Sequence, residues 1–181
     1  MALSYPRNEL CDGVVRLRRW SETDLSCVKE ASADPRIPRG TSVPVTFTVE
    51  EGLAFIHRQW GRAEKGEGLS LALADAVTNE ANGLAVLMHR PQPGVVGLGY
   101  WVIPRARGRG FAARAARLLS TWALRDEGMA RVEAWVEAGN AASQRVLQAA
   151  GFTHEGVLRS FLSYEDQRVD ALVFSQTTED L

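Results

Sequence analysis

Apolar positions along this chain recur with two periods, which predict strands and helices in turn. Residues 13–20 alternate apolar and basic side chains, a pattern typical of a half-buried strand. Ser21 is a good N-cap, and the helix that it starts should end near Asp34, because Pro35 disfavours helix in the residue before it. After a loop rich in proline and glycine, a second helix is predicted over residues 49–65, with apolar side chains on one face.

The middle of the chain predicts three strands in succession. Residues 69–74 and 83–88 are apolar segments bounded by turn-forming residues. Residues 95–103 form a nearly continuous apolar run, which predicts a central strand covered on both faces. Gly97 and Gly99 within this run indicate a bulge, or a backbone that another group approaches closely.

The second half of the chain alternates strands with helices around one loop rich in glycine and arginine. The predicted elements are, in order, a helix that begins at Phe111 and stops at Gly128, a strand over 131–137, a short helix capped by Asn140 that ends at Gly151, and strands near 152–161 and 168–174. Antiparallel strands therefore come first and one β-α-β crossover lies in the middle. This order predicts a mixed α/β fold in a single domain over residues 1–181.

Composition and charge exclude several classes of protein. The chain has 181 residues, 45% of them hydrophobic, and a net charge of −1. These values are ordinary for a globular domain and leave no basic field to hold nucleic acid or an anionic membrane. No apolar run approaches the roughly 18 residues that span a bilayer, and the first ten residues do not resemble a secretory signal. We therefore expect a soluble cytoplasmic protein without a metal site, since Cys11 and Cys27 have no His or Cys at ligand spacing beside them.

The loop over residues 105–112 is the most informative segment. It joins the predicted central strand to a helix, and it holds three arginines, two glycines and no acid. A helix N-terminus presents unpaired N–H groups and the positive end of the helix dipole, and Gly108 and Gly110 let a ligand approach the backbone closely. Three arginines at this end of a helix oppose the dipole unless an anion is present. The loop therefore predicts a site for an anion such as a diphosphate.

Two kinds of phosphate loop compete for this segment. Residues 108–113 fit the dinucleotide fingerprint G-x-G-x-x-A, which predicts a nicotinamide oxidoreductase. That fingerprint should open the first βαβ unit and precede an acid by about 20 residues, whereas here four strands and two helices come first. A P-loop is excluded, because the chain contains no G-K-[ST] sequence.

A second kind of loop fits better. The segment R-G-R-G-F-A at 107–112 resembles motif A, Q/R-x-x-G-x-G/A, of the GNAT superfamily of acyl-CoA-dependent N-acyltransferases. G-Y-W-V at 99–102, N-A-A-S at 140–143 and G-F at 151–152 are similar to the branch typified by the ribosomal-protein-alanine acetyltransferases, RimJ and RimL. The resemblance implies the GNAT fold: a mixed, mostly antiparallel, twisted sheet with a central β-α-β crossover and helices on both faces.

The resemblance also implies where acetyl-CoA, the default acyl donor, would bind. In this family the backbone amides of the motif-A loop hold the diphosphate of CoA. The main chain of the preceding strand, which splays from its neighbour, pairs with pantetheine, and an N–H there can stabilise the oxyanion of acyl transfer. The implied cofactor-binding residues are Trp101, Val102, Ile103, Arg107, Gly108, Arg109, Gly110, Phe111, Ala112, Asn140 and Ser143.

The sequence says less about the catalytic residues. Many family members place a tyrosine acid four residues before the G-F pair, but here that position is Leu147. The resemblance therefore implies Ser143, in the first turn of a helix, as the group that stabilises the departing thiolate. Glu137, at the end of its strand, is the candidate general base, with Glu133 deeper on the same face. More distant candidates are Tyr164, Asp166 and His89.

These residues predict direct attack of a primary amine on the thioester in a ternary complex, without an acyl-enzyme. The favoured acceptor is the α-amine of a protein or peptide, because a site without a strong base suits an amine of low pKa. A small-molecule amine, including an antibiotic, is the alternative acceptor, and a non-catalytic acyl-CoA-binding module is the alternative function. We expect the acceptor determinants in the two N-terminal helices, the loop over 35–44 and the last hairpin. A homodimer would be in keeping with the RimJ and RimL branch.

Overall fold

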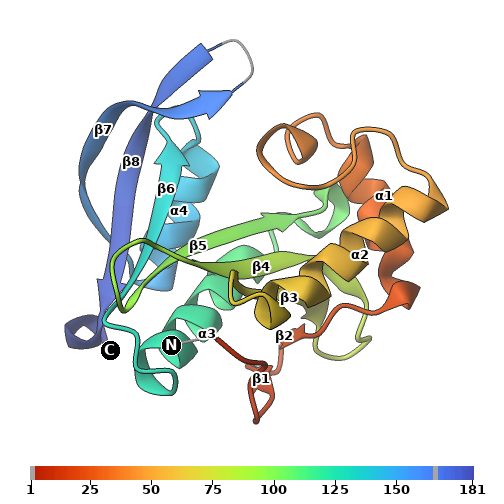
Figure 1. Cartoon of the computed structure of the whole chain (residues 1–181), viewed down its shortest axis with the longest axis horizontal. Coiled ribbons are helices and arrows are strands. Elements are labelled where there is room, and N and C mark those ends of the chain that lie inside the picture. Colours follow the sequence, from red (N-terminus) through yellow and green to blue (C-terminus); the bar gives the residue numbers. More distant parts are fainter. Residues whose placement is uncertain (1–2, 165–166) are drawn as a thin grey trace.

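A computed structural model describes residues 3–164 and 167–181, and these form one eight-stranded sheet flanked by four α-helices (Figure 1). The spatial order of the strands is β1-β2-β3-β4-β5-β6-β8-β7. The strands are β1 (Leu10–Cys11), β2 (Val15–Arg18), β3 (Gly68–Asp75), β4 (Ala81–His89), β5 (Val95–Val102), β6 (Arg131–Glu137), β7 (Thr153–Tyr164) and β8 (Gln167–Thr177). The helices are α1 (Leu25–Ala33), α2 (Val49–Glu64), α3 (Phe111–Arg125) and α4 (Ala141–Ala150).

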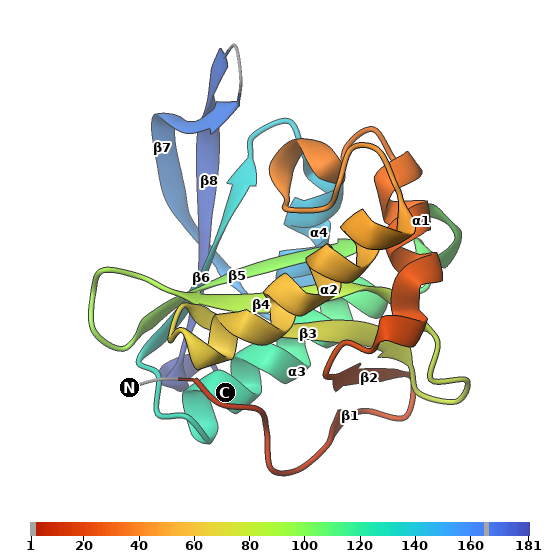
Figure 2. The ribbon, with the colours of Figure 1, turned by 45° about the vertical axis from the view of Figure 1, so that its right-hand side comes forward.

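The helices cover the sheet from both sides. Helices α1 and α2 pack over β3 and β4 on one face, and α3 and α4 pack together on the other (Figures 1 and 2). Strands β3 and β4 are consequently buried along nearly their whole length. The predicted α/β class, with helices on both faces of a mixed sheet, is confirmed.

Among the described strands, only β5 and β6 pair in parallel, and they lie at the centre of the sheet. Helix α3 connects β5 to β6, so the predicted β-α-β crossover is confirmed. The ladder between these strands joins Val95–Gly97 only to Arg131–Glu133, although both strands continue further. We call the unpaired remainder, residues 98–102 of β5 and 134–137 of β6, the splay. Beyond the Gly97–Glu133 pair, no ladder joins the two strands.

An aromatic cluster fixes the orientation of β5. Trp101 packs against Trp20 and Phe55, with ring centroids 6.1 and 6.3 Å apart, and all three side chains are buried. Phe55 belongs to α2, so Trp101 faces the α1 and α2 layer. Because side chains alternate along a strand, Tyr100 and Val102 face the opposite layer, which contains α3 and α4.

The N-terminal strand is shorter than the pattern predicts. Strand β2 begins only at Val15, because the Asp12 carboxylate accepts the N–H groups of Val14 and Val15, each at 2.9 Å, and forms a turn. Gly13 in this turn has φ 85°, in the left-handed region. The turn leads back to β1, a two-residue strand that the sequence analysis missed.

The glycines of β5 mark a close approach and not a bulge. The register of β4 with β5 runs without a shift over the whole ladder. A Cβ on Gly97 would overlap the Arg90 guanidinium, which crosses the strand at this point. Arg90 Nε donates to Glu133 at 3.1 Å, and its guanidinium lies 3.6 Å from the ring centroid of Trp135. The absence of a side chain at Gly97 therefore leaves room for the Arg90 guanidinium.

Candidate active site

Alternate residues of β5 direct their main-chain groups toward the splay. In the antiparallel ladder with β4, Ile103 N–H donates to the Asn82 carbonyl at 2.9 Å and Arg90 N–H to the Val95 carbonyl at 3.0 Å. Odd-numbered residues of β5 therefore pair with β4, and even-numbered residues point their N–H and C=O groups to the other side. Among Trp101, Val102 and Ile103, this geometry narrows the predicted main-chain contact to Val102.

The loop between β5 and α3 leaves a run of backbone donors open. The N–H groups of residues 108–113 have no acceptor in the part of the chain that the structure describes, whereas Arg107 N–H already donates to the Pro104 carbonyl at 3.2 Å. Gly108 and Gly110 have φ values of 75° and 77°, and a Cβ on either would meet no atom within 4 Å. Six consecutive N–H donors without a protein acceptor, at a helix N-terminus, fit a diphosphate.

Each of the three loop arginines is paired with an acid from another element. The pairs are Arg105 with Glu30 (2.9 Å) and Glu80 (2.7 Å), Arg107 with Asp34 (2.8 Å), and Arg109 with Asp75 (3.2 Å). The prediction that these arginines need a bound anion to offset the helix dipole is therefore wrong, because each already has an acidic partner. Acids up to 75 residues away in sequence already neutralise them. The predicted anion site would therefore depend on the backbone N–H groups, and the arginines brace the loop through their ion pairs.

Asp34 connects to this loop and to the end of β5 through Arg107. The Asp34 side chain is 5% exposed, and its Oδ1 accepts the N–H groups of Arg36 (2.8 Å) and Ile37 (3.2 Å). Its Oδ2 accepts Arg107 Nη2 at 2.8 Å, and Arg107 Nε donates to the Val102 carbonyl at 3.0 Å. Burial acts to raise the pKa of Asp34, but the hydrogen bonds from Arg36 and Arg107 outweigh it and hold that pKa below its usual value.

The start of α4 places two predicted residues beside the splay. Asn140 is the N-cap, and its Oδ1 accepts Ser143 N–H at 3.1 Å. Ser143 Oγ lies 2.6 Å from the phenol oxygen of Tyr100 in β5. Leu147, one turn further along, is fully buried in the core. The role of Asn140 as a cap is confirmed, while its contact with pantetheine and the chemical role of Ser143 stay predictions.

The two candidate carboxylates of β6 differ in what surrounds them. Glu133 accepts from Arg90 at 3.1 Å and Arg131 at 3.2 Å and is largely buried, so it belongs to a structural ion-pair network. Glu137 makes no ion pair with any described residue and lies four residues beyond the last ladder pair with β5. Burial is the main cause that raises the pKa of Tyr164, and the negative charge of Glu137 raises that pKa further. Asp166 lies outside the described residues.

Glu137 and Ser143 flank the splay from opposite faces of the sheet. Gly97 pairs with Glu133, and paired residues share a face, so the odd-numbered side chains of both strands lie on the face covered by α1 and α2. Ser143 lies on the other face, to which Tyr100 projects. A group bound between the strands would therefore have a hydroxyl on one side and a carboxylate on the other, two groups that can take part in general acid–base catalysis.

Two of the three regions predicted to select the acceptor lie close together. The loop between α1 and α2 stands opposite the β7–β8 hairpin (Figure 2), and the Arg39 guanidinium lies 4.5 Å from the ring centroid of Tyr164. Trp135 of β6 packs edge-to-face on Phe161 of β7, with ring centroids 4.6 Å apart. Trp135 shares the face of Glu137, so aromatic surface adjoins the candidate base.

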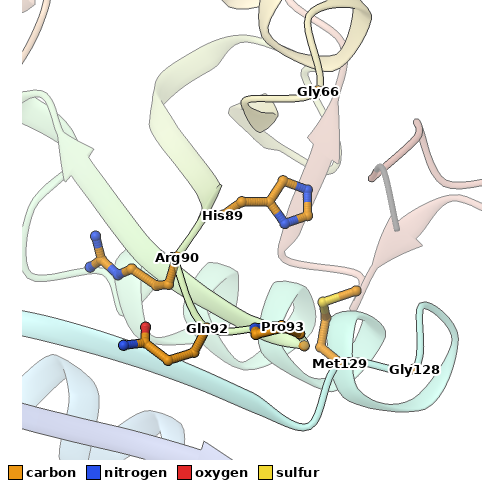
Figure 3. A pocket seen from close by; sticks show the side chains of 8 residues that line it. Gly66, His89, Arg90, Gln92, Pro93, Gly128 and Met129 are labelled. Atoms are coloured by element: carbon orange, nitrogen blue, oxygen red, sulfur yellow. The ribbon is translucent and has the colours of Figure 1, made fainter.

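A cavity of about 650 Å³ lies at the opposite end of β5 and does not belong to this site. Its lining residues are Gly66, His89, Arg90, Gln92, Pro93, Gly94, Gly128 and Met129 (Figure 3). Strand β5 runs eight residues from this cavity to the loop before α3, a span of about 25 Å at roughly 3.3 Å per residue. His89 is therefore too distant to act as the base.

Residues 3–164 and 167–181 lack two features. No cluster of three or more His, Cys, Asp or Glu side chains is arranged to hold a metal ion. None of the helices there combines the length and apolar character that crossing a membrane requires.

Sequence reasoning did not single out Tyr100 or Asp34. Tyr100 stands in the G-Y-W-V segment, and the alternation of the strand could have placed it opposite Trp101, facing α4. Asp34 was interpreted only as a helix end before proline. No local pattern could have predicted its partner, Arg107, in a loop much later in the chain.

Comparison with known proteins gives a family match over most of the chain. The model of the acetyltransferase (GNAT) domain matches residues 15–153. YoaA of Bacillus subtilis strain 168, an uncharacterised N-acetyltransferase, is 24% identical over 165 residues, which are 88% of this chain and 90% of YoaA. The dinucleotide-binding interpretation of the loop, and with it the nicotinamide oxidoreductase, is therefore wrong.

Solved structures show the same fold. RimJ of Mycobacterium smegmatis, in complex with CoA-disulfide, has a TM-score of 0.81 and 24% identity, covering 93% of this chain and 84% of RimJ. The microcin C7 self-immunity acetyltransferase MccE, in complex with acetyl-CoA and AMP, has a TM-score of 0.78 and 17% identity, covering 92% of this chain and 93% of MccE. The resemblance noted in the sequence is confirmed, and this chain belongs to the GNAT family of N-acetyltransferases.

Proposed function

We propose that this enzyme transfers the acetyl group of acetyl-CoA to the α-amine of a protein or peptide by direct attack in a ternary complex. The observation that carries the donor half is the run of six unpaired N–H groups at residues 108–113, at the start of the 15-residue helix α3. Such a run can bind several phosphate oxygens at once, and the helix dipole adds to the attraction. RimJ and MccE, which share the fold, were solved with CoA-disulfide and acetyl-CoA.

The remaining contacts with acetyl-CoA are assigned to hydrogen-bonding groups that the protein does not already use. Residues 108–112 would hold the diphosphate through their amides, and Arg107 would act through its side chain by bracing the loop. Val102 N–H faces the splay and would pair with pantetheine or with the thioester carbonyl. Asn140 uses its oxygen to cap α4, so its NH₂ group is the part left to donate to pantetheine.

The acid–base groups stand on either side of the thioester in this proposal. The amine nitrogen attacks the carbonyl carbon, and Val102 N–H stabilises the negative charge that develops on oxygen. Glu137 accepts a proton from the amine through water. Ser143 donates a hydrogen bond to the sulfur as the C–S bond breaks.

The protonation of amines favours an α-amine as acceptor. At pH 7 an α-amine with a pKa of about 7.7–8.0 is roughly one-tenth neutral, whereas a lysine side chain with a pKa of about 10.4 is about 0.04% neutral. Only the neutral form attacks. A site whose candidate base is the partly exposed Glu137, acting through water, suits an amine that is already partly deprotonated.

Two alternatives remain open to experiment. MccE, which shares the fold with a TM-score of 0.78, was solved with AMP beside acetyl-CoA. This small molecule in a similar fold supports a small-molecule amine as the second candidate acceptor. A non-catalytic module would bind acyl-CoA and release no thiol.

A mass-shift screen with acetyl-CoA separates these functions. The panel holds a peptide with a free N-terminus, the same peptide with a blocked N-terminus and a free lysine, ribosomal-protein N-terminal peptides, and aminoglycosides. We expect acetylation of the free N-terminus. Preference for the blocked lysine peptide or an aminoglycoside would reject the acceptor, and tight CoA binding without thiol release from any amine would support the binding module.

A further inference from the structure

Tyr100 of β5 and Ser143 of α4 form a hydroxyl pair at the edge of the splay. The phenol oxygen lies 2.6 Å from Ser143 Oγ and 3.2 Å from the Ser143 carbonyl oxygen. Tyr100 is half-buried and stands two residues before Val102, whose amide faces the splay. Ser143 is in the first turn of the ten-residue helix α4, where the helix dipole favours negative charge nearby.

The surroundings of the pair favour the phenol as donor. Burial raises the pKa of Tyr100 to about 12, so the phenol keeps its proton at neutral pH. A serine within a helix commonly donates back to the carbonyl four residues earlier, but α4 begins only at Ala141, so that turn is missing for Ser143. Among the described residues, Ser143 Oγ contacts no polar group other than the phenol.

We propose that Tyr100 is the positioning residue for Ser143: its phenol donates to Ser143 Oγ and so directs the Ser143 O–H toward the sulfur of CoA. This inference rests on the function proposed above. It extends the site to the side chain of Tyr100, which acts through Ser143.

Neither hydroxyl changes its protonation state in the step. The amine nitrogen forms the new C–N bond and loses one proton to Glu137 through water. The C–S bond breaks, and its electron pair stays on sulfur as a thiolate. The thiolate accepts a hydrogen bond from Ser143 and takes its proton from water on release. Stabilising the thiolate in this way lowers the pKa of the bound CoA thiol.

The test measures that thiol pKa directly. Iodoacetamide alkylates the thiolate of enzyme-bound CoA at a rate that depends on pH, and mass spectrometry follows CoA alone. This readout needs no acceptor and no turnover. The variants are Tyr100→Phe, Ser143→Ala and the double variant, each of which removes only a hydroxyl. Ser120→Ala is the matched control, because it removes a buried hydroxyl that bonds Gln176 in a different region.

We expect the thiol of bound CoA to titrate about one pH unit below that of free CoA, a tenfold gain in thiolate. Tyr100→Phe and Ser143→Ala should each move the thiol pKa back toward that of free CoA, and the double variant no further than Ser143→Ala. Ser120→Ala should leave it unchanged. At neutral pH, where the thiol of CoA is largely protonated, the affinity for CoA should be equal in all four variants. With an amine that the enzyme acetylates, kcat should be lower in Tyr100→Phe, Ser143→Ala and the double variant than in the wild type. The KM for acetyl-CoA should stay unchanged.

The outcomes separate the inference from the proposed function. A thiol pKa that Tyr100→Phe leaves unmoved, or an effect of Tyr100→Phe that persists in full on Ser143→Ala, would overturn the positioning role. A shifted thiol without acetylation of any amine would reject the proposed acceptor and support the hydroxyl pair. Failure of CoA to bind the wild-type protein would reject both.

Discussion

Arg107 donates to the buried Asp34 carboxylate at 2.8 Å and to the Val102 carbonyl at 3.0 Å, so one guanidinium joins the start of the α1–α2 loop to the end of β5. The same carboxylate holds the backbone of Arg36 and Ile37. That segment leads to Arg39, which contacts the β7–β8 hairpin on the acceptor side. The loop proposed to bind acetyl-CoA and the loop predicted to select the acceptor therefore share one buried carboxylate.

Asp34→Asn should weaken CoA binding while it preserves the turn. An asparagine oxygen can still accept the N–H groups of Arg36 and Ile37, but the amide lacks the charge that holds Arg107. We expect the Kd for CoA to rise roughly tenfold, which corresponds to about 1.4 kcal/mol. Loss of a charged hydrogen bond should also cost about 1.5–3 kcal/mol of stability. Calorimetric titration with CoA and urea unfolding measure the two effects.

The control for Asp34→Asn is Glu22→Gln, which breaks the exposed pair with His57 far from this loop. It should change neither the affinity for CoA nor, beyond a few tenths of a kcal/mol, the stability. An unchanged Kd for CoA in Asp34→Asn would show that Arg107 does not position the loop.

Gly110→Asp should abolish most CoA binding through its charge. Gly110 has φ 77° and open space where a Cβ would stand, so a side chain fits there at the cost of some backbone strain. Asn and Asp both tolerate this conformation better than other residues, which makes Gly110→Asn an isosteric, uncharged control. A like charge about 4 Å from a phosphate costs roughly 1–4 kcal/mol, so we expect Gly110→Asp to bind at least fivefold more weakly than Gly110→Asn. Equal affinities would mean that no phosphate lies there.

Glu137→Gln should slow acetyl transfer without affecting the fold. Removing a general base typically costs about 10²-fold or more in rate, and a partly exposed glutamine at the end of β6 should allow normal folding. Glu133→Gln provides the contrast, because Glu133 pairs with Arg90 and Arg131 and should lose stability first. We expect kcat to fall in Glu137→Gln and the unfolding midpoint to fall in Glu133→Gln. The reverse pattern would assign the base to Glu133.

The sequence indicates the candidate donor loop more clearly than it indicates the residues that support this loop. Glycines at 108 and 110 signal a backbone that must be approached, and this signal is local, so the loop could be found from six residues. The splay could not be derived from strand patterns, because a strand that leaves its neighbour has the same alternation as one that stays paired. Only the resemblance to the GNAT family implied it.

The partners of the loop arginines could not be predicted for a different reason. Arg105 and Glu30 lie 75 residues apart, and Arg109 and Asp75 lie 34 apart, so each pair exists only once the sheet has brought α1 and β3 beside the loop. Charges are abundant in any sequence, and nothing local distinguishes a paired one from a solvated one. The three arginines therefore looked like anion ligands before the fold showed them to be braces.

Glu155→Gln should flatten the acid limb of the stability curve. Arg131 and Ser175 donate to Glu155 and lower its pKa from 4.5 to about 2. A depressed pKa contributes stability that is complete above the unfolded value, 4.5, and is lost as pH falls toward 2. Glu155 is 41% exposed, so solvent screening limits the contribution to about 1 kcal/mol. In urea unfolding, the free energy of unfolding of the wild type should exceed that of Glu155→Gln at pH 7, and this difference should shrink at pH 3. The exposed control Glu179→Gln should match the wild type at both pH values. A difference between wild type and Glu155→Gln that stays constant with pH would show that the ion pair does not set the pKa of Glu155.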